Sequence, residues 1–152
     1  MSRFNWVAPL GLALALSLMA AEPGVKLEIV GGTLAGVPAK LGARLDMTAT
    51  DGLHIRYSET DILIPYQKVN TLEYGQNVSR RYAAAVLISP MLLLSKSRKH
   101  FVTIGYVDGE GTQQALVFRI QKGDIRSVLA GLEARSGRRV EYQDDDARKA
   151  GQ

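Results

Sequence analysis

Apolar and polar residues alternate through much of this chain, and this two-residue period restricts the fold more than any other feature. In residues 25–30, aliphatic side chains alternate with Lys26 and Glu28. Successive side chains of a strand point to opposite faces, so the alternation is typical of a half-buried strand. The same pattern, or a short apolar run, recurs in residues 41–47, 53–57, 62–64, 69–74, 101–107 and 115–120. The sequence therefore predicts a mainly β domain.

Turn motifs between these segments indicate which strands are neighbours. Asp51-Gly52 separates the second and third segments, and residues 108–111 (Asp-Gly-Glu-Gly) separate the last two. Both motifs favour tight turns, so we expect a hairpin at each position. Gly31-Gly32 is expected to end the first strand, and Pro65 the fourth.

The period changes near the C-terminus. Four aliphatic residues recur at helical spacing: Ile125, Val128, Leu129 and Leu132. Asp124 precedes them as an N-cap or first-turn acid, and Gly137 stands where a helix would stop, which predicts one amphipathic helix over residues 124–136. We expect the four aliphatic side chains to be buried by the sheet, residues 139–142 to add a short strand, and residues 143–152 to form a polar, disordered tail.

The N-terminal segment has the layout of a secretory signal. Arg3 precedes an apolar run over residues 7–19, which ends in Ala20-Ala21 before Glu22. The run is shorter than the ~20 residues that a membrane-spanning helix needs, so a cleaved signal is favoured over an uncleaved anchor. This predicts a signal peptide over residues 1–21, an N-terminal strand and linker over 22–40, and a β domain over 41–142. The protein is then exported, with the periplasm as its expected location.

Positive charge is concentrated in one part of the sequence. The net charge is +4, which is too small to indicate nucleic-acid binding. Between Tyr74 and Val107, however, there is no acidic residue, and an apolar run over residues 83–94 lies between two basic clusters. The candidate contact residues in and around this run are Arg80, Arg81, Leu92, Leu93, Lys96, Arg98 and Lys99.

This basic-flanked segment, residues 80–99, has two interpretations. The apolar run could lie at a membrane interface with its cations near anionic lipid headgroups. The favoured interpretation is that it is part of the core, or a contact with an envelope protein or a second copy of the chain, because short apolar runs are usually buried.

Four stretches of sequence carry a family resemblance: Asp51-Gly52-Leu53-His54-Ile55, Ile64-Pro65-Tyr66 with Val69, Leu72-Glu73-Tyr74-Gly75, and the hairpin over residues 101–120 that leads into the helix. In this order they resemble the bacterial pleckstrin-homology-like and GRAM-like domains, over residues 41–136. Residues 72–76 are also similar to a run in uncharacterised exported bacterial proteins.

This resemblance implies an antiparallel, curled sheet or partly open barrel capped by the helix, and a role in binding proteins or lipids rather than in catalysis. Phosphoinositide-binding members gather several basic residues at the first hairpin. Here that hairpin has Asp51 at its turn and only Arg44 and Arg56 nearby. Phosphoinositide binding is therefore not expected.

No catalytic, cofactor or metal site is predicted. The chain has no cysteine, and His54 and His100 are its two histidines, each without a carboxylate at metal-ligand spacing. The sequence also contains no glycine-rich phosphate loop and no nucleophile motif. We therefore expect a non-enzymatic binding module that contacts a membrane surface or an envelope protein, with a structural or oligomerisation role in an envelope assembly as the alternative.

Overall fold

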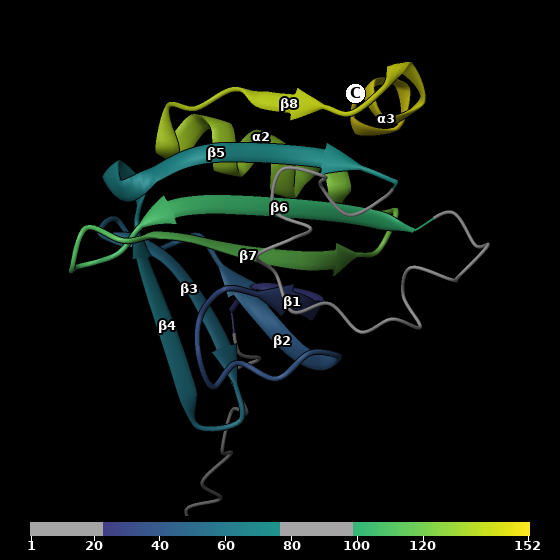
Figure 1. Ribbon diagram of the computed structural model, residues 1–152. Coiled ribbons are helices and arrows are strands. Elements are labelled where there is room, and N and C mark those ends of the chain that lie inside the picture. Colours follow the sequence, from purple (N-terminus) through teal and green to yellow (C-terminus); the bar gives the residue numbers. More distant parts are fainter. Residues whose placement is uncertain (1–22, 77–98) are drawn as a thin grey trace, which may run out of the picture.

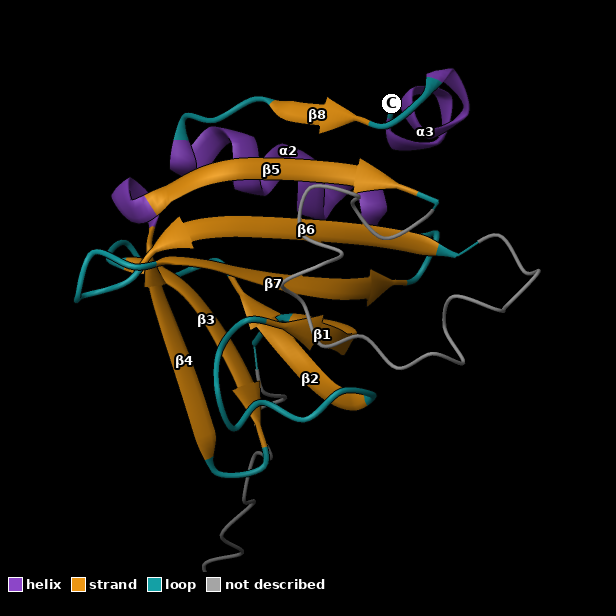
Figure 2. Cartoon of the chain, viewed as in Figure 1, coloured by secondary structure: helices purple, strands orange, loops and turns teal. Residues whose placement is uncertain are grey.

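The computed structural model describes residues 23–76 and 99–152, which form eight strands in one sheet together with two α-helices. The strands, shown in Figure 1, are β1 (Val25–Gly32), β2 (Leu41–Asp46), β3 (Gly52–Tyr57), β4 (Thr60–Pro65), β5 (Val69–Gly75), β6 (His100–Val107), β7 (Gln113–Ile120) and β8 (Val140–Tyr142). A single 3-10 turn, η1 (Tyr66–Lys68), joins β4 to β5. The helices are α2 (Ile125–Ser136) and α3 (Asp145–Gly151), which Figure 2 distinguishes from the strands.

The order of the described strands is β4-β3-β2-β1-β7-β6-β5-β8, so β4 and β8 are the outermost of them and they do not close into a barrel. Both predicted hairpins are confirmed, because β2 pairs with β3 and β6 with β7 in antiparallel register. β3 and β4 run at a steep angle to β5, β6 and β7 in Figure 1, which curls the sheet around one face. The prediction of a mainly β, curled sheet is confirmed at this level.

β1 lies in the middle of the sheet and pairs on both sides. Val25 is opposite Leu45 of β2, and Leu27 is opposite Ile120 of β7. The β7 ladder shifts register between Ile29 and Gly31, which is the signature of a β-bulge. The strand therefore continues through Gly31 and Gly32 instead of ending before them.

The inner face of the sheet holds the core. Alternate residues of seven strands point inward, and the largest of their fully buried side chains are Ile29, Leu45, Leu53, Ile55, Ile64, Leu72, Tyr74, Ile104, Leu116 and Phe118. Helix α2 packs against them with Ile125, Val128, Leu129 and Leu132, each at most 2 % exposed. Gly137 ends the helix in the left-handed conformation at φ 68°. The helix and its buried face are as the sequence predicts.

Two features of the C-terminal region differ from the prediction. β8 pairs with β5 in parallel, with Leu72 opposite Val140, so the sheet is mixed and not wholly antiparallel. Helix α2 connects β7 to the short β8 at the far edge, and β8 runs in the same direction as β7 and β5. A two-residue period does not distinguish parallel from antiparallel pairing.

The expected disordered tail is the second difference, because residues 145–151 form α3. The Asp144 side chain accepts a hydrogen bond from the Ala147 N–H at 2.7 Å, and Asp145 and Asp146 lie in the first turn. Carboxylates at these positions stabilise a helix by capping free N–H groups and by facing its positive end. Ala147 is fully buried against the core, so tertiary packing retains this short helix.

Leu129 gives a direct test of the helix packing. Leu129→Asp should cost at least ~3 kcal/mol of unfolding free energy, because it places a carboxylate without a partner among aliphatic side chains. Ala130→Asp is the matched control, since Ala130 is the neighbouring residue and is exposed. Chemical denaturation of both variants should show a large loss for the first and a loss below ~1 kcal/mol for the second. Equal losses would mean that this face of α2 does not pack on the sheet.

Candidate functional site

Most of the predicted contact residues lie outside the part of the chain that the structure describes. Arg80, Arg81, Leu92, Leu93, Lys96 and Arg98 fall in residues 77–98, and the expected signal peptide falls in residues 1–22. Lys99 is described, and its side chain is half-buried immediately before β6.

The chain leaves β5 and enters β6 at the same end of the sheet. The chain leaves β5 after Gly75 and enters β6 at His100, and Gly75 is paired with Phe101 across the two strands. β7 also ends here, with Ile120 opposite His100. Figure 1 shows this end of the sheet on the right, beside α3.

Two adjoining hollows at this end are lined by cations. A groove of about 420 Å³ contains Lys26, Lys99 and Arg119, and a pocket of about 570 Å³ contains Lys122, Arg126 and Lys149. His100 lines both. We call these six basic residues together the basic end.

The charge at the basic end is only partly balanced by described residues. Arg119 contacts Glu28 as an ion pair, and Asp146 is the one acidic side chain among those lining the pocket. Lys122, Arg126 and Lys149 form no ion pair with any described residue. Sequence reasoning missed this cluster because its members come from β1, β7, α2, α3 and the segments before β6 and after β7, so no single stretch of sequence shows it.

His100 is held in place by a buried tyrosine. The Tyr74 hydroxyl and the His100 Nδ1 are 2.6 Å apart, and the two rings lie almost parallel, at 4°. Burial raises the pKa of Tyr74 to about 12, so its hydroxyl keeps its proton. Burial, together with the nearby Lys122, lowers the pKa of His100. A neutral His100 that accepts the Tyr74 hydroxyl hydrogen bond at Nδ1 carries its own proton on Nε2.

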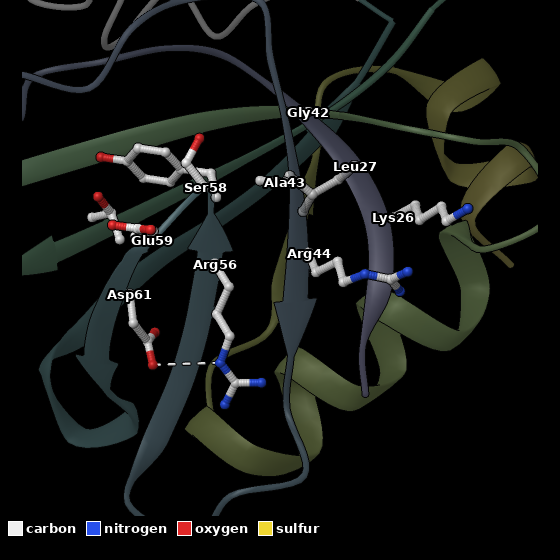
Figure 3. Close-up of a pocket in the computed structure, with 11 residues that line it drawn as sticks. Lys26, Leu27, Gly42, Ala43, Arg44, Arg56, Ser58, Glu59 and Asp61 are labelled. Atoms are coloured by element: carbon white, nitrogen blue, oxygen red, sulfur yellow. Dashed lines mark hydrogen bonds and ion pairs between the residues drawn. The ribbon is translucent and has the colours of Figure 1, made fainter. Parts of the chain in front are cut away.

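A second polar cluster lies on β2, β3 and β4, beside a hollow of about 510 Å³ drawn in Figure 3. Arg56 bridges two carboxylates, at 3.0 Å from Asp46 and 3.4 Å from Asp61. The same Asp61 lies 2.9 Å from His54 Nδ1, and Asp51 lies 3.5 Å from Nε2. Sequence spacing gave no sign of these two carboxylates, because the β3–β4 pairing and the turn before β3 bring them to His54.

The protonation states in this cluster follow from its hydrogen bonds. Asp46 is almost fully buried and accepts bonds from the Thr48 hydroxyl and N–H, which, with Arg56, lower the pKa of its carboxyl group. The hydrogen bond to Asp61 raises the pKa of His54. Each group thus has a structural partner, and no set of three metal-ligating side chains is placed to hold an ion among the described residues.

Comparison with known proteins does not assign the chain to a family: it matches no family model, and no curated protein is significantly similar to it. Within the described residues, no helix is long and apolar enough to cross a bilayer.

The His54–Asp61 contact predicts a pH-dependent contribution to stability. The pKa of His54 is raised in the folded protein, so the contribution is complete below the unfolded value of ~6.5 and is lost as the pH rises through the folded value. Asp61→Asn should therefore lower the unfolding free energy more at pH 5 than at pH 9. The difference should be below ~1 kcal/mol, because Asp61 is 43 % exposed.

Glu59→Gln serves as the control for this measurement, since Glu59 is exposed in the adjacent turn. Urea unfolding at both pH values should give the same small change for the control at each. A larger effect of Asp61→Asn at pH 9 would contradict the assigned contact.

Proposed function

We propose that this chain is an exported, non-enzymatic binding module of pleckstrin-homology-like architecture that associates with an anionic membrane surface through its basic end. The curled sheet, the two hairpins and the C-terminal helix packed on the inner face support the architecture. The mixed sheet and the second helix are additions that the resemblance does not include. Export rests on the layout of residues 1–21.

One observation carries the membrane assignment. The folded domain places Lys99, Lys122, Arg126 and Lys149 where residues 77–98 leave and rejoin the sheet. Four further cations of that segment, Arg80, Arg81, Lys96 and Arg98, are close in sequence to this end. Each cation held near an anionic surface contributes ~1 kcal/mol, so the combined set is sufficient for reversible association.

The arrangement of acidic side chains is consistent with this orientation. Asp46 and Asp61 form ion pairs with Arg56, and Asp51 and Asp61 lie beside His54. These residues belong to β2, β3, β4 and the turn before β3. Charges that are already paired add little to long-range attraction or repulsion. These three acidic side chains therefore do not offset the positive charge of the basic end, where the acidic lining residues are Glu28 and Asp146.

Binding to vesicles tests this proposal. The full chain should float with phosphatidylglycerol vesicles, should not float with phosphatidylcholine vesicles, and should be released as salt is raised. The double variant Lys122→Gln/Lys149→Gln should bind about 30-fold more weakly, which corresponds to ~2 kcal/mol for two surface cations.

A matched control shows whether weaker vesicle binding results from the position of the removed charges or from the lower net charge of the chain. Lys68 and Arg139 are exposed cations toward the opposite end of β5 and β8. Lys68→Gln/Arg139→Gln removes the same charge and should reduce binding much less. Three results would refute the proposed orientation and favour a structural role in contact with a protein. They are flotation that does not depend on salt, no flotation of folded protein, or equal losses of vesicle binding in the two double variants.

A further inference from the structure

The pocket at the basic end is built from four separate parts of the chain. Gln76 follows β5, His100 begins β6, Lys122 and Arg126 flank the start of α2, and Lys149 with Asp146 comes from α3. Lys122, Arg126 and Lys149 are all exposed, yet they face one hollow of about 570 Å³. This is a converging arrangement of donors and not a linear stripe of charge.

The net charge of the pocket defines the charge of a matching ligand. Its three cations and single carboxylate give a net charge of +2 when His100 is neutral. A phosphate monoester carries −1.5 to −2 near pH 7, whereas a phosphate diester or a carboxylate carries −1. A dianionic group therefore balances the pocket, and a monoanion leaves it positive.

The types of donor present favour phosphate oxygens. Arg126 offers a planar guanidinium fork that can bind two oxygens, and the two lysines add mobile point charges. His100 adds a fixed neutral donor, because its Nδ1 is occupied by Tyr74 and its Nε2 contacts no described residue through a hydrogen bond. Tyr74 is itself fully buried, which holds the imidazole in place before any ligand arrives.

We propose that the pocket formed by His100, Lys122, Arg126 and Lys149 binds a phosphate monoester group. The inference rests on the proposed function, because it names the anionic group that the basic end would meet at a surface. A monoester headgroup of a lipid and a free phosphorylated molecule share this chemistry. The experiment therefore contains one arm for each source.

The first arm uses inorganic phosphate as the probe. Calorimetric titration of the full chain at pH 8 and constant ionic strength should show saturable binding of phosphate and weaker binding of dimethyl phosphate, a monoanionic diester. Arg126→Gln and Lys149→Gln should each weaken phosphate binding about tenfold or more, since each removes a charge-assisted donor. Lys68→Gln removes the same charge outside the pocket and should leave the affinity unchanged.

Nuclear magnetic resonance of the imidazole nitrogens gives an independent readout. In the free protein, the His100 ring should show a protonated Nε2 and an unprotonated Nδ1 at neutral pH. Addition of phosphate should shift the Nε2 signal and leave the His54 ring unchanged. Because Arg126 and Lys149 are exposed, their variants should keep the parental melting temperature, so lost binding would not reflect unfolding.

The second arm compares vesicles of phosphatidic acid, a monoester lipid, with vesicles of phosphatidylglycerol, a diester lipid, at equal surface charge. A preference for phosphatidic acid that Arg126→Gln removes would assign the site to a lipid headgroup. Equal vesicle binding with saturable free phosphate would assign it to a soluble ligand. Either result supports the proposal that this pocket binds a phosphate monoester group.

The experiments give different results if the monoester site is wrong and if the proposed membrane association is wrong. Salt-dependent flotation on phosphatidylglycerol, together with no saturable phosphate binding and no preference for phosphatidic acid, would overturn the monoester site and leave surface association intact. Saturable phosphate binding without flotation on any anionic vesicle would refute surface association and keep the site. Identical phosphate titrations of Lys68→Gln and Arg126→Gln would place any binding outside this pocket and overturn the inference.

Discussion

β1 connects the two parts of the sheet, because among the described strands its ladders with β2 and β7 are the only strand pairing between β2–β4 and β5–β8. Close approach at the end of β1 requires glycine. A Cβ atom on Gly32 would lie 2.6 Å from Leu116 Cδ2 and 2.9 Å from the Ala115 carbonyl oxygen. A larger residue at this position would push β1 away from β7. It would thereby separate the part of the core under β2–β4 from the part under β5–β8.

The basic end is a consequence of this join. Because β1 lies beside β7, Lys26 and Glu28 come next to Arg119 and to Lys99 at the start of β6. Helix α2 then begins at the same end of β7, which adds Lys122 and Arg126, and α3 docks nearby with Lys149. Cations that are far apart in the sequence thus meet where residues 77–98 leave and rejoin the sheet. The net charge of the chain gives no indication of this concentration.

Local patterns were sufficient to predict the strands, both hairpins and α2, because alternation, the Asp51-Gly52 turn and the Ile125–Leu132 spacing each act over a few residues. Pairing over long distances was not predictable in this way. The parallel β8, the two carboxylates around His54 and the pocket beside His100 all depend on which strands become neighbours. The helix α3 did have a local signal, since Asp144 stands as an N-cap before two further acids, but its polar composition suggested a disordered tail.

The central claim is that the domain approaches an anionic surface with its basic end. Paramagnetic relaxation by spin-labelled lipid in phosphatidylglycerol vesicles measures this orientation directly, because the broadening of each amide signal falls steeply with distance from the label. The account predicts strong broadening at His100, Lys122, Arg126 and Lys149 and little at β4 (Thr60–Pro65). Broadening centred on β4, or equal broadening over the whole domain, would contradict it.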